Sequence, residues 1–163
     1  MKTKLEIFFT KIVDDRVDYW KKEIDITYAR HDPDDLVLEL ITNKFHEPPD
    51  MVSQDYLIHS TSWRYTTDTT VILTYIVYSD HIDFGNRKVS SIPLHSLMLA
   101  HSSNIKKPRP IEITDENVVS HGMRHLGFLT RTDKRHMYSQ IMKPHTLSSL
   151  RRIFINLAGR IDV

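Results

Sequence analysis

Apolar and polar residues alternate over much of the first third of the chain, a pattern typical of strands with one buried face. Segment Lys4–Val13 is rich in isoleucine, valine and phenylalanine, and Val17–Tyr28 alternates isoleucine and tyrosine with charged residues. In Leu36–Thr42 a leucine stands at every second position up to residue 40. These patterns predict three strands. A loop is predicted over Asn43–Asp55, where two consecutive prolines interrupt regular structure.

Tyr56–Asp80 contains two further strand-like runs separated by the polar residues Thr66–Thr70, which predicts a β-hairpin. Side chains alternate between the two faces of a strand, so a regular hairpin with this loop has only one register. The more apolar face is expected to point inward. Its opposing pairs would be Tyr65 with Val71, Trp63 with Leu73, Thr61 with Tyr75, His59 with Val77, and Leu57 with Ser79.

Two helices are predicted in the second half of the chain. Thr114–Arg131 opens with a threonine that can cap it and with two acidic residues that suit the positive end of a helix dipole. Thr146–Ala158 carries an apolar stripe at helical spacing. Because strands come first and helices last, we predict an α+β fold in which a bent antiparallel sheet packs against these two helices. A barrel-like or Nudix-like arrangement of the sheet is the alternative.

Composition narrows the class of protein only slightly. The chain has 163 residues, of which 40% are hydrophobic and 26% charged, and we expect one domain spanning 1–163. It has no cysteine, which excludes disulfides, thiolate metal sites and a cysteine nucleophile. No apolar run approaches the roughly 18 residues that span a membrane, and the one near the N-terminus is too short for a signal peptide. We therefore expect a cytoplasmic protein without membrane contact.

The net charge of +1 conceals an asymmetry between the two halves of the chain. Residues 1–81 contain 9 basic and 15 acidic residues, whereas residues 82–163 contain 13 basic and 6 acidic ones. The basic half could attract a phosphate-bearing partner, or the halves could pack on each other or on a second copy. No more than two basic residues are consecutive, which favours the second interpretation. A nucleic-acid partner is not expected, since only Ser62–Tyr65 combines aromatic and basic residues.

The predicted inward face of the hairpin carries polar and aromatic side chains that would need partners or a ligand. Trp63 and Tyr75 could provide stacking surfaces for a ligand, with His59 and Thr61 as polar contacts. These four residues are therefore candidate ligand-binding residues. In the alternative interpretation, the histidine and the threonine are core residues bonded to the backbone, and the tryptophan is simple packing.

A second candidate site lies on the helix predicted at Thr114–Arg131. His121 and His125 stand four residues apart, so their imidazoles share one helix face and could bind a divalent metal ion or line a cavity. Gly122 occupies the position where zinc proteases of this spacing carry a catalytic glutamate, which excludes that class. Gly122 also falls in the apolar face, which predicts close approach of another backbone or of a ligand. A third metal ligand would have to come from elsewhere; the candidates are His59, His95, His101 and Glu116.

Three segments resemble a family of uncharacterised bacterial proteins: the HSTSWR run from His59 to Arg64, the VILTY run from Val71 to Tyr75, and the HGMRHL run from His121 to Leu126. The resemblance covers about residues 56 to 130 and implies no known activity. The chain is also similar to Nudix proteins in mixing a sheet with a few helices. However, the predicted helix lacks the carboxylates with which the Nudix box binds metal, so Nudix hydrolysis is not implied.

Three hypotheses about function follow from these observations. The first is a small-ligand binding domain whose pocket lies between the hairpin at 56–80 and the helix at 114–131. The second is a metal-dependent enzyme using His121 and His125. The third is a protein-interaction module that forms a homodimer through its oppositely charged halves. The residues expected to bind the small-molecule ligand of the first hypothesis are His59, Thr61, Trp63, Tyr75, His121 and His125.

Overall fold

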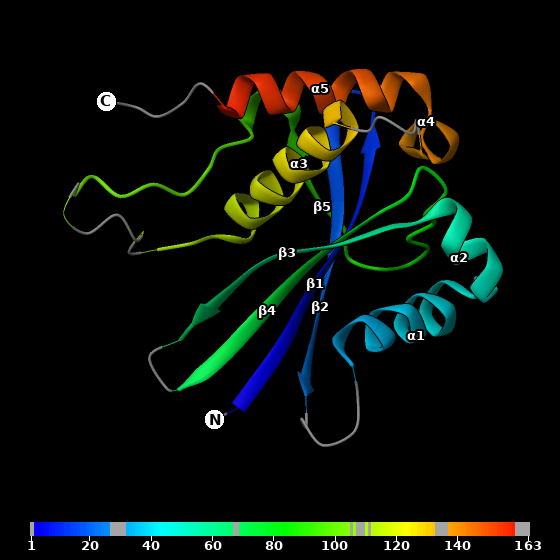
Figure 1. The fold of residues 1–163 in the computed structure, drawn as a ribbon, viewed down its shortest axis with the longest axis horizontal. Helices are drawn as coiled ribbons and strands as arrows, with labels where there is room; N and C mark the ends of the chain where they lie inside the picture. The colour runs from blue at the N-terminus through cyan, green and yellow to red at the C-terminus, as the bar shows by residue number, and fades with distance from the viewer. Residues whose placement is uncertain are drawn as a thin grey trace.

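A five-stranded sheet forms the centre of the molecule (Figure 1). The computed structural model describes residues 2–26, 32–66, 69–104, 106, 110, 112–132 and 137–158. The strands lie in the order β3-β4-β1-β2-β5, and the fold class is α+β, as predicted. Their bounds are β1 Lys2–Val13, β2 Arg16–Ile26, β3 Leu57–Tyr65, β4 Thr70–Tyr78 and β5 Ser90–Pro93.

Helices cover both faces of this sheet (Figure 1). Strand β1 shows why: Phe8 and Ile12 pack into one apolar cluster, while Leu5, Ile7 and Phe9 pack into a second one on the opposite face. We call these the α3 face and the α1 face. The helices are α1 Pro33–Phe45 and α2 Pro49–Asp55 on the α1 face, α3 Asp115–Thr132 and α5 Pro144–Ala158 on the α3 face, with the short helix α4 Met137–Ile141 and the 3-10 turn η1 Leu94–Ser96. None of the described helices is both long and apolar enough to cross a bilayer.

The strand predicted at Leu36–Thr42 is wrong, because this segment belongs to helix α1. The buried residues are Val37, Leu40 and Ile41, whose spacing of three and four is helical, whereas Leu38 is exposed. The Asp32 side chain caps the helix by accepting a hydrogen bond from the Asp34 amide. The loop predicted over Asn43–Asp55 is wrong at both ends, because residues 43–45 belong to α1 and Pro49–Asp55 forms α2.

The remaining elements follow the predictions more closely. Strands β1 and β2 lie where Lys4–Val13 and Val17–Tyr28 were predicted, although residues 27 and 28 lie outside the described part of the chain. Helices α3 and α5 match Thr114–Arg131 and Thr146–Ala158 to within two residues at each end.

The sheet is not closed into a barrel. It is also mixed rather than antiparallel, because β4 pairs in parallel with β1. This pairing is possible because the chain crosses over through α1 and α2 before it enters the hairpin.

Two glycines allow α3 to approach its neighbours closely. A Cβ at Gly122 would lie 2.5 Å from Cδ1 of Ile76 on β4, so α3 rests directly on that strand. The close approach predicted at Gly122 is therefore to a side chain rather than to a backbone or ligand. A Cβ at Gly127 would overlap the carbonyl oxygen of Leu150 on α5. These contacts pack α3 closely against both the sheet and α5.

A β-bulge in strand β3 changes the register predicted for the hairpin. Tyr65 pairs with Val71 and Trp63 with Leu73, as predicted, but the register shifts between Ser60 and Ser62. Beyond the shift the predicted pairs are wrong: His59 lies opposite Ile76 and Leu57 opposite Tyr78. One extra residue reverses the face occupied by every side chain that lies beyond the bulge, counted from the hairpin loop. The bulge therefore turns His59 to the α3 face and leaves Trp63 on the α1 face.

Candidate functional site

Three histidines from two elements come together on the α3 face of the sheet. His59 on β3 and His125 on α3 are hydrogen-bonded, with 3.3 Å between Nε2 of the former and Nδ1 of the latter. The ring centroids of His121 and His125 are 4.4 Å apart, as expected for neighbours on successive helical turns. We call His59, His121 and His125 the histidine cluster. It lies between the hairpin and α3, where the sequence predicted a pocket.

The β-bulge also positions a backbone partner for this cluster. The backbone of Thr61, at the bulge, interacts with the His121 ring as a hydrogen-bond acceptor and favours its protonated form. The Thr61 hydroxyl donates to the carbonyl of Thr74 on β4. Thr61 thus contributes to the site through its backbone, whereas its side chain stabilises the irregular strand.

The surroundings of all three imidazoles disfavour the protonated form. Burial lowers the pKa of His59. Burial and the nearby Arg124 guanidinium lower the pKa of His121. The interaction with the Thr61 backbone raises it and so partly opposes this shift. Burial, together with His121, His59 and Arg124, lowers the pKa of His125 to about 4. At neutral pH the cluster therefore consists of uncharged rings, each with one N–H donor and one nitrogen acceptor.

A hollow of about 180 Å³ adjoins the cluster and is lined by Arg124, His125, Phe128 and Phe154. The centroids of the two phenylalanine rings are 5.8 Å apart, and the Arg131 guanidinium lies 5.5 Å from the centroid of the Phe154 ring. Within the described part of the chain, Arg124 takes part in no ion pair. The hollow therefore combines an unpaired cation, an uncharged imidazole and two aromatic rings.

Two of the six predicted ligand-binding residues lie elsewhere. Trp63 is 63% exposed and lies on the α1 face, where it contacts Tyr65 edge-on. Tyr75 is buried in the apolar cluster of the α1 face, and its hydroxyl donates to Asp34 at the start of α1. The structure brings together His59, Thr61, His121 and His125 but separates them from Trp63 and Tyr75 by the thickness of the sheet.

The predicted metal site has only part of the necessary arrangement. His59 is the third histidine beside His121 and His125. His95 instead lies near α5, and His101 is exposed. Across the described residues, no group of three or more histidines, aspartates and glutamates has an arrangement that could hold a metal ion. Metal binding at His121 and His125 stays a prediction.

Sequence reasoning missed Arg124, Phe128 and Phe154 as possible site residues. Arg124 stands three residues after His121, and Phe128 three after His125, so both project from neighbouring parts of the α3 surface. Helical spacing around the histidine pair could have identified these two residues. Phe154 comes from α5, and only the packing of α5 on α3 brings it to the hollow.

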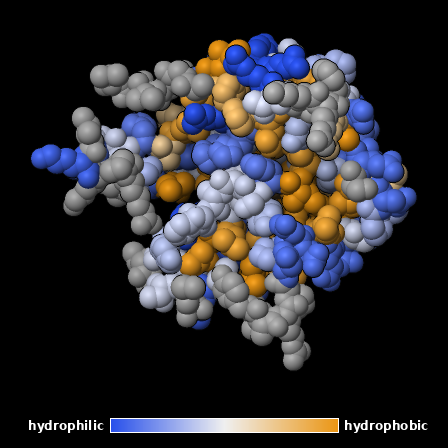
Figure 2. Space-filling model, viewed as in Figure 1, coloured by the Kyte–Doolittle hydropathy of each residue, from blue (hydrophilic) through white to orange (hydrophobic). Residues whose placement is uncertain are grey.

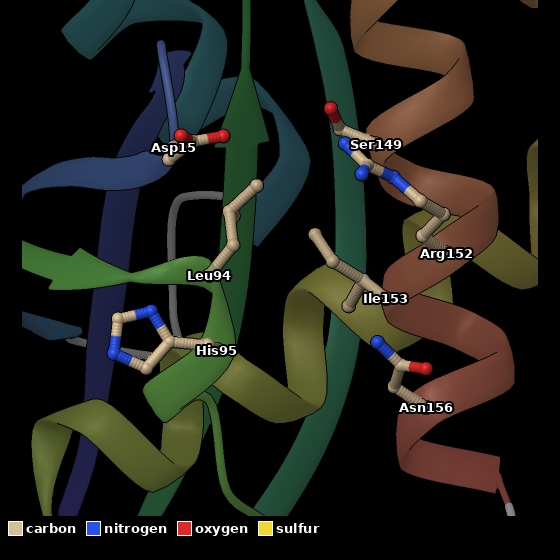
Figure 3. A pocket seen from close by; sticks show the side chains of 7 residues that line it. All are labelled: Asp15, Leu94, His95, Ser149, Arg152, Ile153 and Asn156. Carbon is tan, nitrogen blue, oxygen red and sulfur yellow. The ribbon is translucent and has the colours of Figure 1, made fainter.

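A larger hollow lies on the same side of the sheet, between η1 and α5 (Figure 3). Sequence reasoning did not identify it, because it combines side chains from three segments far apart in the chain. The visible surface in Figure 2 alternates between hydrophobic and hydrophilic areas. A homodimer through the oppositely charged halves stays a prediction.

Comparison with known proteins adds no assignment to these sites. No protein-family model matches the chain, and no curated protein is similar to it in sequence.

Proposed function

We propose that this protein is a small-molecule binding domain whose ligand is an organic anion with an aromatic or apolar body. The anionic group would contact the Arg124 guanidinium and the His125 imidazole. The body of the ligand would pack against the exposed surfaces of Phe128 and Phe154. The observation that carries this proposal is the position of Arg124, which forms no ion pair with any described residue and lies between a cluster of uncharged imidazoles and an aromatic-lined hollow.

The size of the hollow limits the ligand. A volume of about 180 Å³ is slightly larger than the roughly 150 Å³ cavity that accommodates benzene in another protein. A single ring bearing a carboxylate or a phosphate is therefore a suitable probe, and a larger ligand would extend into solvent. A guanidinium binds both kinds of anion through paired N–H groups, so Arg124 fits either.

Binding of an anion should be coupled to uptake of protons. The charge of Arg124 disfavours protonation of His121 and His125 in the free protein. A bound anion would offset that charge and raise the pKa of both imidazoles. By linkage, affinity should then increase as the pH falls from about 7.5 toward 6.

Titration calorimetry with benzoate and phenyl phosphate tests this proposal and distinguishes a carboxylate from a phosphate ligand. We expect at least one probe to bind at millimolar concentration or below, with proton uptake that changes the heat between buffers. Arg124→Gln and His125→Gln should each weaken binding about tenfold or more. Trp63→Ala, on the opposite face, and His101→Ala, exposed and outside the lining of the hollow, are matched controls that should bind as the unmodified protein does.

Binding of neither probe by the folded protein would contradict the proposal. So would equal loss of affinity in Trp63→Ala and Arg124→Gln, because no contact through the hollow could explain it.

The second candidate is a metal-dependent enzyme. The distance of 3.3 Å between the nitrogens of His59 and His125 is close to the separation of two imidazole ligands on a tetrahedral zinc ion with bonds of about 2.0–2.1 Å. The hydrogen bond from His121 to a backbone carbonyl resembles the way metal-bound histidines are held.

A native mass spectrum tests this second candidate and the homodimer together. Metal binding predicts extra mass at near-stoichiometric level that disappears in the double variant His121→Ala, His125→Ala. An apo mass after purification with added zinc would exclude it, and the same spectrum reports monomer or dimer.

A further inference from the structure

The hollow between η1 and α5 extends into a second hollow beside it. Their volumes are about 280 Å³ and 330 Å³, and they share Leu94, His95, Ile153 and Asn156. In Figure 3, Asp15 and His95 lie on one side and the α5 side chains on the other, with Leu94 between them. The Asp15 carbonyl accepts a hydrogen bond from the Leu94 amide, which ties the β1–β2 turn to this wall. We call the joined hollows the η1–α5 groove.

One end of the groove carries two opposite charges that are not joined to each other. Asp15 lies in the β1–β2 turn, and Arg152 lies on α5 (Figure 3). Over the described residues, neither side chain takes part in an ion pair or a side-chain hydrogen bond. A ligand with one positive and one negative group could therefore contact both.

A largely buried serine at the same end presents its hydroxyl to the groove. Ser149 is only 5% exposed and lines the groove, one helical turn before Arg152. No hydrogen bond of its hydroxyl is found within the part of the chain that the structure describes. The hydroxyl is accessible from the groove and is available to bond a group that enters it. An acceptor held by Arg152 would lie within reach of the same helix face.

The other end of the groove is lined by aliphatic side chains together with the polar His95 and Asn156. It adds Leu97 and Leu157, both 4% exposed, to the shared Leu94 and Ile153. Burying an aliphatic side chain there would be favourable by the hydrophobic effect. The groove therefore has two opposite charges at one end and, at the other, four aliphatic side chains beside polar ones, an arrangement suited to a small amphipathic zwitterion.

We propose that the η1–α5 groove binds an α-amino acid with an aliphatic side chain. Its ammonium group lies beside Asp15, and its carboxylate beside Arg152 and the Ser149 hydroxyl. Its side chain extends toward Leu97 and Leu157. This site is separate from the hollow at Arg124, and it does not depend on the function proposed there.

An anion alone would satisfy Arg152 and Ser149 but would bring a negative charge toward Asp15. An apolar ligand would leave all three polar groups without partners, which is costly for any that lose water. An amino acid satisfies both charges and fills the aliphatic end, which is why this class fits better than either of the others.

Titration calorimetry with L-leucine tests the proposal, with two blocked analogues as probes of each charge. We expect L-leucine to bind at millimolar concentration or below. N-acetyl-L-leucine, which lacks the ammonium, and L-leucinamide, which lacks the carboxylate, should each bind at least about tenfold more weakly. Equal binding of the acetylated form would show an anion site instead and overturn the proposal, as would absence of binding by L-leucine.

Neighbouring residues provide matched controls for the variants. Arg152→Gln and Asp15→Asn should each weaken L-leucine binding about tenfold, whereas Arg151→Gln and Asp14→Asn, whose side chains do not line the groove, should leave it unchanged. Ser149→Ala should weaken binding severalfold without loss of folded protein. Unchanged affinity in both Arg152→Gln and Ser149→Ala would place the ligand elsewhere and contradict the proposal.

Discussion

Two polar clusters lie on the α3 face of the same sheet: one around Glu6, and the histidine cluster. The first has many hydrogen-bond and ion-pair partners, and the second has few. Glu6 on β1 is 2% exposed, and both of its oxygens accept hydrogen bonds from Arg64, at 2.9 Å each. Lys21 lies 3.0 Å from the same carboxylate, and the Thr74 hydroxyl also donates to it. The histidine cluster, in contrast, has few partners beyond its own rings and the Thr61 backbone.

This difference decides the charge that each cluster carries. Burial by itself would raise the pKa of Glu6, but the hydrogen bonds from Arg64 and Lys21 hold it below its usual value. Within the described residues no carboxylate pairs with the three histidines, and burial favours their neutral form. A cluster that is fully paired stabilises the fold. A cluster that lacks a counter-ion is the better place to look for a ligand.

The largest expected effect comes from breaking the paired cluster. Glu6→Gln leaves the Arg64 guanidinium without its buried counter-charge, whereas Lys21 keeps its pairs with Asp115 and Glu23. We expect a loss of about 3 kcal/mol in the free energy of unfolding, measured by chemical denaturation. Glu23→Gln is the matched control, because Glu23 also contacts Lys21 but is half exposed. That change should cost less than about 0.5 kcal/mol. Similar losses in the two variants would show that burial of the pair is unimportant.

The second expected effect concerns the unpaired cluster under mild acid. An unfolded histidine has a pKa near 6.5, whereas that of His125 in the fold is about 4. Between these values the unfolded chain binds a proton that the folded protein does not, so stability falls as the pH drops from 6.5 to 4. Because the ring is only half buried, solvent screens the effect. We expect about 1–2 kcal/mol at His125, measured by denaturation of metal-free protein.

The two clusters should affect the stability of the protein in different pH ranges. The pKa of Glu6 in the fold is below 4.5, so its stabilisation is present above that pH and is lost only as the pH falls further. His125→Gln should therefore flatten the decline between pH 6.5 and 4 and leave the decline at lower pH. An unchanged decline in that variant would mean that His125 is not held neutral by its surroundings.

The smallest expected effect tests the division between the two faces of β3. Trp63→Ala removes an exposed ring from the α1 face, and we expect a change of about 0.5 kcal/mol in stability. The nuclear magnetic resonance signals and the pKa of the three histidines should not move. A shift in His59 on this substitution would mean that the bulge does not separate the two residues in solution.

Several elements could be predicted because their signals are local. The periodicity and capping of α3, the apolar stripe of α5 and the alternation in β1 each depend on neighbouring residues in the sequence. The helix α1 also carried local signals, namely Asp32 as a cap, Pro33 in the first turn and two acidic residues after it. The prediction of a strand gave more weight to three leucines at alternate positions than to these helix signals. One of these leucines, Leu38, is exposed in the structure.

The histidine cluster shows where prediction from sequence stopped. The i, i+4 spacing of His121 and His125 was sufficient to place them side by side. Whether His59 joined them depended on the register of β3, and strict alternation put it on the same face as Trp63. One inserted residue at the bulge reversed that result, and no local feature of the HSTSWR segment marks it.

The sequence alone determined which segments bury an apolar face and which side chains are close through helical spacing, because both depend on periods of a few residues. The tertiary structure decided that the sheet has helices on both faces, that β4 lies parallel to β1, and that His59 faces α3. It also brought Asp15, Leu94 and Ser149 to one groove. These outcomes depend on contacts between residues distant in the chain, whose energies are set by packing and burial rather than by local pattern.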